Sequence, residues 1–398
     1  MSRSQELLDR IITPADIDLA IELTKEIVRI PSINGDEGEV GRHIYKRLRE
    51  LGFEDIALDE VLPARYNATG VIRGNRPGRT FVLNGHIDTK PVCLGWDEDP
   101  FCGEIRDGRL YGHGVMDMKA AVASSIAAAH ALKRSGLDFA GEVYVAAVAD
   151  HMGQQIGAIE FFKKVKADLC ILGEVSDNRI YLGHRGRYYF DISTLGRAAH
   201  TIHKYDAVSA INKMTRVVQK IDEIRYFPEL SDEVRELFGE ELYTVVGRIY
   251  GGLPPDGPSM IPDRCTIRVD TRPQPGISVE EVQAVLQEAI DEAVREDPNI
   301  QTEIALADQK DGHWVDKNSE IVQLITEAAR TVKDEEPTYH GVAWLGDTAS
   351  FGKLVPTVIF GPGREPIYMP NEYLDLQDIE VATKVYALTA AMALDPRV

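Results

Sequence analysis

The sequence predicts an α/β protein of two domains, with the second domain inserted into the first. Apolar strand-like runs alternate with helical patterns up to about residue 183, strands with an alternating pattern then take over, and the first arrangement resumes near residue 319. A chain of 398 residues is also too long for one ordinary hydrophobic core. We therefore place a catalytic domain at residues 1–184 and 300–398 and an inserted domain at residues 185–299.

The first domain is expected to contain a sheet with buried central strands. Apolar residues at helical spacing mark its helices, and short runs of β-branched and small residues mark its strands. The expected helices are residues 16–29, 36–51, 118–132, 319–332 and 376–394. The expected strands are residues 58–62, 67–72, 81–83, 142–148, 167–172 and 357–360, with a turn at 346–348. The alanine-rich helix 118–132 is apolar on most faces, so we expect it to be packed inside.

The inserted domain follows a different order of elements. Its expected elements are strand 186–195, helix 206–218, strands 244–250 and 265–270, helix 279–296 and a last strand at 301–306. This strand-helix-strand-strand-helix-strand order is typical of a ferredoxin-like α+β unit.

Ionisable side chains follow three of the expected strands of the first domain. His86 and Asp88 come after the first of these strands. His151 comes after the second and Glu174 after the third, while Asp117 precedes the alanine-rich helix. Because open α/β sheets gather their sites at the carboxyl ends of parallel strands, these residues predict a metal site.

Composition limits the possible partners. The formal charge of −20 and the pI near 5.0 argue against a nucleic acid or an anionic membrane surface, because these polyanions would be repelled at long range. No segment resembles a membrane span or a signal peptide, so we expect a cytoplasmic protein with a small-molecule substrate. The four cysteines lack the spacing of a zinc knuckle and are too few for a disulfide framework.

The order of short motifs along the chain resembles that of one family of metallopeptidases. The matching segments are His86-x-Asp88, Asp117-Met-Lys119, Gly173-Glu174, Gly196-x-x-x-His200, Asp270-x-Arg272, Gly361-Pro-Gly363 and Asn371-Glu372. Each motif alone is weak, but together they resemble the family that includes aminoacylase, acetylornithine deacetylase, succinyl-diaminopimelate desuccinylase and carboxypeptidase G. The resemblance covers nearly the whole chain. It implies a zinc-peptidase-like catalytic domain with a mixed sheet and an inserted lid or dimerisation domain.

The resemblance also implies a set of metal ligands. Members of this family usually hold two zinc ions that one aspartate carboxylate bridges. By position, His86 and Glu174 would bind one ion, and Asp117 would be the bridging residue. Asp88 would fix the imidazole tautomer of His86 without touching the ion.

Two departures from the family pattern argue against a second ion. Both ligands that belong to the second ion alone are replaced, one by Met152 and the other by Tyr368. A thioether cannot replace a carboxylate for a hard divalent cation. We therefore expect one divalent ion per subunit, Mn²⁺ or Zn²⁺, with Asp117 as an ordinary ligand. Decay to an inactive relative is the alternative explanation of the two losses.

His151 stands where the family has its general base. An imidazole with a pKa near 6.5 can take and return a proton at neutral pH, although an ordinary loop histidine is the alternative. Met152 and Tyr368 would then form an apolar, hydrogen-bonding wall that suits a flat aromatic ring.

Two residues of the inserted domain complete the expected site. His200 matches the family's histidine that reaches into the partner subunit's site and stabilises negative charge on the substrate, which implies a homodimer or a higher homo-oligomer. Arg272 matches the arginine that binds a substrate carboxylate, and a structural salt bridge to Asp270 is the alternative for it.

These residues favour a metal-dependent hydrolase of a carbon–nitrogen bond in a small, carboxylate-bearing substrate. The departures resemble those of the 5-nitroanthranilic acid aminohydrolase type, which points to hydrolytic deamination of an aromatic amine, giving 5-nitrosalicylate and ammonia. The first alternative is a one-metal amidohydrolase, a deacylase or dipeptidase acting on N-acyl amino acids. The second is a non-catalytic binding protein on the same fold.

Overall fold

The computed structural model of the chain describes residues 2–252 and 259–394, and these residues form two compact units. Unit 1 comprises the chain up to Gly183, Trp314–His340 and the chain from Gly346 on. Unit 2 comprises His184–His313 and Gly341–Leu345. The structure thus places the return to unit 1 later than the expected boundary at residue 299. The reason is that strand β14 (Gln301–Lys310) pairs with strand β9 (Arg187–Leu195) and keeps the chain in unit 2.

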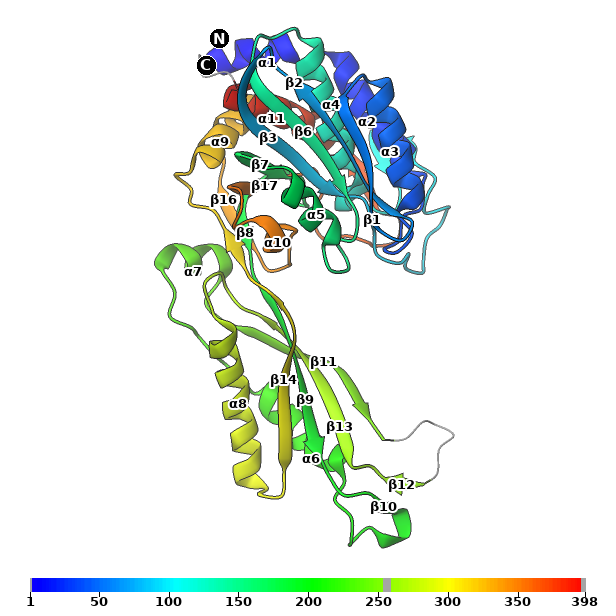
Figure 1. Cartoon of the computed structure of the whole chain (residues 1–398), viewed down its shortest axis with the longest axis vertical. Helices are drawn as coiled ribbons and strands as arrows, with labels where there is room; N and C mark the ends of the chain where they lie inside the picture. Colours follow the sequence, from blue (N-terminus) through cyan, green and yellow to red (C-terminus); the bar gives the residue numbers. More distant parts are fainter. Residues whose placement is uncertain (1, 253–258, 395–398) are drawn as a thin grey trace. The chain divides into compact units, whose positions relative to one another are not determined.

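Unit 1 is organised around a mixed sheet of nine strands (Figure 1). The sheet runs in the order β1-β2-β6-β3-β7-β17-β8-β15, and β16 pairs with β8 at its side. The strands are β1 (Glu54–Leu62), β2 (Arg65–Arg73), β3 (Arg76–His86), β6 (Ala140–Val148), β7 (Leu169–Leu172), β8 (Ile180–His184), β15 (His313–Trp314), β16 (Tyr339–Val342) and β17 (Thr357–Ile359). Strands β6, β3, β7 and β17 are parallel neighbours, as the pattern of buried strands predicts.

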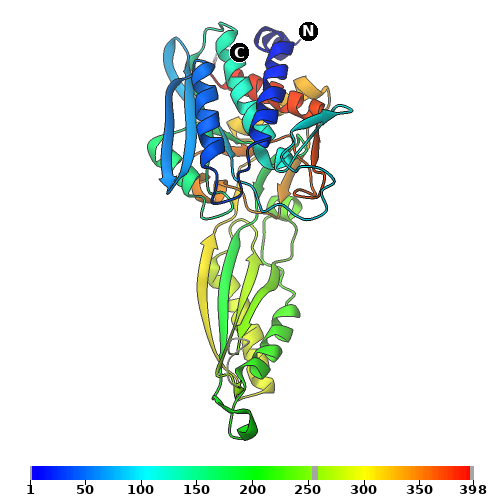
Figure 2. The same ribbon diagram turned by 90° about the vertical axis from the view of Figure 1, so that its right-hand side faces the viewer.

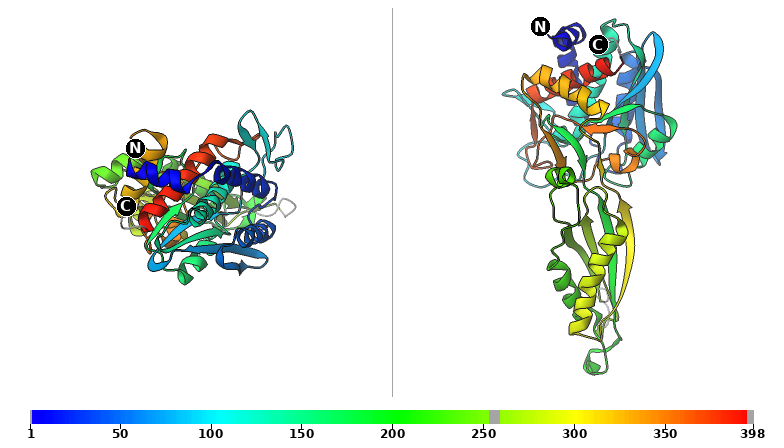
Figure 3. Two further views of the ribbon diagram at one scale, coloured as in Figure 1. Left: turned by 90° about the horizontal axis from the view of Figure 1, so that it is seen from above. Right: turned by 90° about the vertical axis from the view of Figure 1, so that its left-hand side faces the viewer.

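Helices cover this sheet and pack on one another. Their bounds are α1 (Arg3–Ile11), α2 (Pro14–Val28), α3 (Gly38–Glu50), α4 (Ala120–Arg134), α5 (Ile156–Lys164), α9 (Glu320–Lys333), α10 (Thr348–Phe351) and α11 (Leu376–Leu394). Helix α4 contacts α2 and α11 and is buried along most of its length, which confirms that its apolar faces lie inside. Helices α9 and α11 lie side by side in the right-hand view of Figure 3.

Several features of unit 1 differ from the expectation or add to it, among them the helices α1 and α5. The segment expected to be only a turn at residues 346–348 begins the short helix α10. A three-stranded sheet, β18-β5-β4, also lies outside the main sheet. Its strands are β4 (Glu104–Arg106), β5 (Arg109–Tyr111) and β18 (Tyr373–Asp375).

Unit 2 is a ferredoxin-like α+β domain, as the order of its elements predicts. Its antiparallel sheet has the order β11-β13-β9-β14, and helices α6 and α8 lie on one face (Figure 2). The bounds are α6 (Ala210–Asp222), α7 (Asp232–Phe238), β11 (Tyr243–Gly251), β13 (Arg264–Arg272) and α8 (Val279–Glu296), with a small ladder of β10 (Ala199–His200) and β12 (Met260–Ile261). The core between sheet and helices is apolar and includes Phe190, Met214, Ile267 and Leu286.

No helix in residues 2–252 or 259–394 is both long and apolar enough to cross a membrane.

Candidate metal centre

Three neighbouring parallel strands of unit 1 bring ionisable side chains to one edge of the sheet. His86 is the last residue of β3 and lies opposite Val148, the last residue of β6. His151 follows β6 after two residues, and Glu174 follows β7 after one. The sheet therefore assembles residues that lie far apart in the sequence, as the positions of the strand ends predict.

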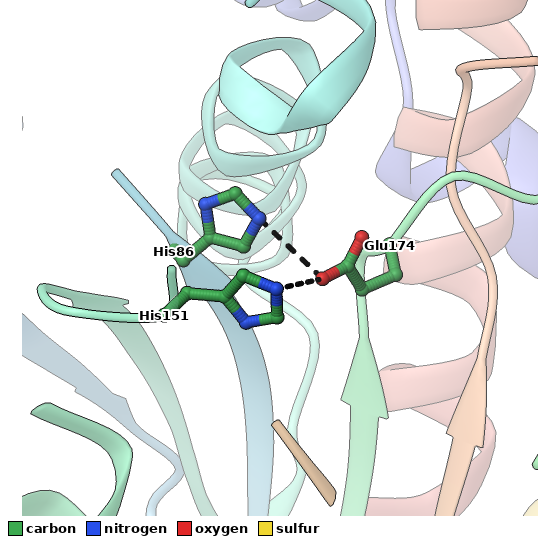
Figure 4. A group of neighbouring side chains, drawn as sticks. All are labelled: His86, His151 and Glu174. Atoms are coloured by element: carbon green, nitrogen blue, oxygen red, sulfur yellow. Dashed lines mark ion pairs between the residues drawn. The ribbon is translucent and has the colours of Figure 1, made fainter. Parts of the chain in front are cut away.

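The two imidazoles and the Glu174 carboxylate face one another (Figure 4). His86 Nε2 lies 3.4 Å from Glu174 Oε1, and His151 Nε2 lies 3.5 Å from the same oxygen. His86 Nε2 is also 3.1 Å from Asp117 Oδ1. All four side chains are buried or nearly so, and only His151 keeps some exposure, at 11% of its side chain.

Potential ligand atoms of His86, His151 and Glu174 all lie within 4.8 Å of one another, and His86 also contacts Asp117. Nitrogen and oxygen ligands of zinc lie about 2.0–2.2 Å from the metal, so two ligands of a tetrahedral site are roughly 3.3–3.5 Å apart. The observed separations of 3.1 and 3.4 Å are close to this value. Glu174 Oε1 is buried and accepts no hydrogen bond from any residue that the structure describes. A buried carboxylate oxygen without a donor is costly, and a bound cation would satisfy it.

His151 lies directly beside His86. Its ring stacks on that of His86, with centroids 4.1 Å apart and planes inclined by 13°. The lone pair of an imidazole nitrogen lies in the ring plane, so two nearly parallel stacked rings cannot both direct lone pairs at one ion about 2.0–2.1 Å from each nitrogen. The His151 ring lies against the His86 ring, with its Nε2 3.5 Å from Glu174 Oε1.

Asp117 reaches the site from the irregular turn η1 (Val115–Lys119) that precedes α4. Gly114 opens this turn with φ of +75°, a left-handed conformation that glycine adopts without strain. Two buried ionisable residues hold the turn. Lys119 Nζ donates to the carbonyl of Ile30 over 2.7 Å, and the amide of Met116 donates to a Glu372 carboxylate oxygen over 3.0 Å.

Burial shifts the pKa values of these two supporting groups toward neutrality. It lowers the pKa of Lys119 to about 7 and raises the pKa of Glu372 to about 7. Both residues belong to the motifs that resemble the metallopeptidase family, but their supporting contacts have no signature in the sequence.

Asp88 holds the site differently from the sequence-based prediction. The main-chain carbonyl of Asp88, and not its carboxylate, lies 2.9 Å from His86 Nδ1. The carboxylate accepts hydrogen bonds from the amides of His151 and Met152, over 3.0 and 2.9 Å, and from the side chain of Asn34. Asp88 thus fixes the His86 tautomer through its backbone, and its charge orders the loop that carries His151.

A residue that sequence reasoning missed completes the surroundings of His151. Asp347, at the start of α10, has Oδ1 2.7 Å from His151 Nδ1 and is fully buried. The sequence showed only a Gly-Asp-Thr turn here, and 196 positions separate Asp347 from His151. Neither the spacing nor the periodicity of the sequence signals this contact.

The carboxylates set the charge of the cluster. Burial disfavours the imidazolium of His86, but Glu174 and Asp117 outweigh burial and raise the pKa of His86 well above its usual value. The pKa of His151 is raised as well, because Asp347 outweighs burial and the repulsion from His86. Burial alone would raise the pKa of Asp117, but its hydrogen bond to His86 lowers it. Such a cluster attracts positive charge, as a cation site requires.

On the side of the site that carries Tyr368, the polar groups of this residue are engaged in hydrogen bonds. The Tyr368 hydroxyl donates to the main-chain carbonyl of Asp117 over 3.2 Å, and the thiol of Cys93 donates to the carbonyl of Tyr368 over 3.2 Å. The ammonium of Lys90 lies 5.3 Å from the centre of the Tyr368 ring. Burial, with a contribution from Asp117, raises the pKa of Tyr368 above its usual value, so this phenol stays neutral.

His200 and Arg272 belong to unit 2, so the cluster is described without them. His200 is exposed and its Nδ1 accepts a hydrogen bond from the amide of Ile202. The guanidinium of Arg272 makes two hydrogen bonds to Asp270, of 2.8 and 2.9 Å. The salt bridge considered as the alternative for Arg272 is therefore formed.

Two histidines and Glu174 at the edge of the parallel sheet, with Asp117 from the turn before α4 beside them, are an arrangement typical of metal-dependent hydrolases. The ion that these ligands fit would polarise a substrate carbonyl and activate a water molecule.

Comparisons with known proteins agree with this class and narrow it. The sequence profile of peptidase family M20/M25/M40 matches residues 82–392. Acetylornithine deacetylase of Photorhabdus laumondii subsp. laumondii is 27% identical over 383 residues, which cover 92% of this chain and 94% of that enzyme. The chain therefore belongs to peptidase family M20/M25/M40 and is a metal-dependent hydrolase that acts on carbon–nitrogen bonds.

Solved structures of family members share the fold. The di-peptidase Dug1p from Saccharomyces cerevisiae has a TM-score of 0.77 and 16% identity, with 99% of each chain covered. The YXEP protein from Bacillus subtilis, described as a dinuclear metal binding peptidase, has a TM-score of 0.68 and 16% identity, with 96% of this chain and 99% of that chain covered. The predicted family and fold class are confirmed.

Proposed function

We propose that this protein hydrolyses the amide bond of an N-acyl amino acid or a dipeptide at a site that holds one divalent ion, Zn²⁺ or Mn²⁺. The observation that carries the proposal is the buried Glu174 oxygen, which accepts no hydrogen bond from a described residue and faces His86 Nε2. The similarity to a deacetylase and to a dipeptidase supports amide substrates. The same comparisons do not support deamination of an aromatic amine, so the amidohydrolase becomes the preferred function.

His86, Asp117 and Glu174 would hold the ion in this reaction, and the bound ion would lower the pKa of a water molecule and polarise the amide carbonyl. His151 Nε2 would accept the proton of the attacking water and return it to the leaving amine. Its position next to the ligand set, on the stacked face of His86, supports this role.

The Tyr368 side of the site supports a single ion. Tyr368 and Met152 offer neither a carboxylate nor an imidazole, and the Tyr368 hydroxyl is already engaged with the carbonyl of Asp117. We propose that these two side chains form a wall against the substrate. The YXEP protein, by contrast, is described as dinuclear.

The roles of His200 and Arg272 remain part of the proposal. Arg272 would bind the substrate carboxylate, for which it must exchange its two hydrogen bonds to Asp270. His200 would stabilise negative charge on the substrate of a partner subunit, and its exposed position leaves it available.

We also propose that the protein is a homodimer joined through unit 2. Strand β11 ends the four-stranded sheet and exposes Val245, Ile249 and Tyr250 by 57–61%. A long edge strand with exposed apolar side chains is a template for pairing with a second copy. Light scattering with Ile249→Lys and, as the control, a lysine at Leu306 on the opposite edge strand β14 tests this, because only the first change should yield monomers.

Assays with defined substrates test the function. The metal-free protein, reloaded with Zn²⁺ or Mn²⁺, is given N-acyl amino acids, dipeptides and amino-aromatic acids, and both free amino acid and ammonia are measured. We expect metal-dependent release of free amino acid, with one ion per subunit. Ammonia from an aromatic amine without release of amino acid would replace the proposal by the deaminase. Unchanged ligand binding without metal, and no hydrolysis, would indicate a binding protein.

A further inference from the structure

We infer that Asp347 is a positioning residue, which holds the His151 ring so that Nε2 faces the reacting groups while Nδ1 keeps its proton. The inference deepens the proposed function, on which it rests, by assigning a partner to the residue that stands where the family has its general base. It starts from one contact, the 2.7 Å separation of His151 Nδ1 and Asp347 Oδ1.

The chemistry of this contact selects one tautomer of His151. An ionised carboxylate can only accept a hydrogen bond, so the neutral imidazole must carry its proton on Nδ1. The lone pair then lies on Nε2, the atom that is 3.5 Å from Glu174 Oε1. The other tautomer would leave Nδ1 and Asp347 as two acceptors facing each other and would put an N–H bond where a proton must be received.

The packing of α10 holds the backbone of Asp347 in place. The ring of Phe351 stacks on Phe162 of α5, with centroids 3.9 Å apart and planes inclined by 18°. The buried side chain of Gln155, in the loop that carries His151, donates to the carbonyl of Gly346 over 3.1 Å and accepts a hydrogen bond from Ser350. The loop after β6 and the helix α10 are therefore one hydrogen-bonded body.

The backbone of His151 is held independently of its ring. The amide of His151 donates to Asp88, and the preceding Asp150 forms a buried ion pair of 2.8 Å with Arg65. The backbone contacts fix where the ring begins, and Asp347 fixes how it is turned. Loss of Asp347 should therefore free the ring without releasing the loop.

The chain offers variants that separate positioning from folding. Asp347→Asn keeps an acceptor for Nδ1–H but removes the charge, and Asp347→Ala removes both. Glu26→Gln is the control, because Glu26 Oε2 makes a 2.8 Å contact with His43 Nε2, a short histidine–carboxylate pair between α2 and α3. Each Zn²⁺-loaded variant is measured for kcat and KM with the N-acyl amino acid that the wild type cleaves, for zinc content, and for unfolding by urea.

The tautomer itself is read from histidine labelled with ¹⁵N, with the His151 signals assigned through His151→Gln. In the Zn²⁺-loaded wild type, we expect the neutral His151 imidazole to carry its proton on Nδ1. Asp347→Ala should show a mixture of tautomers and a kcat about 10–100 times lower, while KM and zinc content change less than threefold. The kcat of Asp347→Asn should lie between those of the wild type and Asp347→Ala, and Glu26→Gln should match the wild type in kcat and tautomer.

Two results would overturn the inference. One is a wild-type His151 that carries its proton on Nε2, and the other is an Asp347→Ala variant that keeps kcat within twofold. Because the tautomer is measured without substrate, it still decides the inference if no N-acyl amino acid is cleaved and the proposed function fails. If Asp347→Ala does not fold, the kcat and tautomer of Asp347→Asn decide in its place.

Discussion

The two sides of the metal centre differ in what they offer a cation. The ligand side consists of His86, Asp117 and Glu174. His86 Nε2 lies 3.1 Å from Asp117 Oδ1 and 3.4 Å from Glu174 Oε1. The tyrosine side is defined by Tyr368, whose hydroxyl is bonded to a main-chain carbonyl. We propose that Met152 belongs to the same side. The ligand side gathers negative charge that attracts a cation and that a protonated His86 offsets in its absence, whereas the Tyr368 hydroxyl is satisfied by a main-chain carbonyl. The difference teaches that neighbouring parts of one site can be open to a cation or closed by the protein's own hydrogen bonds.

Removal of a ligand from the ligand side should have the largest effect. We expect His86→Ala to bind no ion at stoichiometric metal and to lower kcat/KM by about 1,000-fold or more, because the ion supplies both the nucleophile and the polarisation of the carbonyl. Metal analysis and steady-state kinetics measure this. His43→Ala, in α3 of the same unit, is the control and should keep both properties. A metal-free His86→Ala that retained full activity would contradict the assignment.

Restoring ligands on the tyrosine side should change the number of ions. We expect the double variant Met152→Glu with Tyr368→His to bind two ions per subunit where the wild type binds one, since a carboxylate and an imidazole are again available. Mass spectrometry of the native protein and metal analysis count the ions. The double variant Met152→Gln with Tyr368→Phe is the control, and it should still bind one. Two ions in the wild type would remove the distinction between the two sides.

Protons should compete with the metal only on the ligand side. The raised pKa of His86 means that its imidazolium stabilises the metal-free fold fully below about pH 6.5 and that this contribution is lost as pH rises through the raised pKa. The ion must displace this proton. We therefore expect apparent metal affinity to rise by up to about tenfold per pH unit, for one displaced proton, as pH rises toward the raised pKa of His86. Titration calorimetry at several pH values measures it, and a constant affinity would show that His86 binds no proton there.

The sequence predicted the residues of the ligand side well, but it did not predict the contacts that hold His86 and His151 in place. His86, Asp117 and Glu174 could be found because strand ends and a helix start are visible as patterns, and parallel strands align their ends. Asp347 could not be found, because a contact between residues 196 positions apart leaves no trace in periodicity or spacing. The use of the Asp88 carbonyl was also invisible, since main-chain atoms are the same in every residue.

The fold shows the same limit at its boundaries. The ferredoxin-like order of elements could be predicted from alternating strands and amphipathic helices. The end of unit 2 at His313 could not, because it depends on how far β14 continues to pair with β9. Local patterns fix the type of an element, whereas long-range pairing decides where a domain ends.

The smallest expected effect is that of Tyr368→Phe, which removes one hydroxyl from the tyrosine side. The variant loses the hydrogen bond to the Asp117 carbonyl, so we expect the free energy of unfolding to fall by about 1 kcal/mol. Tyr386→Phe is the matched control, because the Tyr386 hydroxyl donates to the carbonyl of Phe360 over 2.6 Å. Unfolding by urea and zinc titration compare the two variants.

Both variants should bind zinc within about threefold of the wild type, because neither hydroxyl is a ligand in the proposed site and a neutral hydrogen bond contributes about 1 kcal/mol. A phenol that bound the ion would have to ionise, and burial beside Asp117 opposes its ionisation. The zinc affinity of Tyr368→Phe therefore distinguishes a ligand from a non-ligand. A zinc affinity reduced tenfold or more in Tyr368→Phe alone would make Tyr368 a ligand. The tyrosine side would then be a second cation position, and the single-ion proposal would fail.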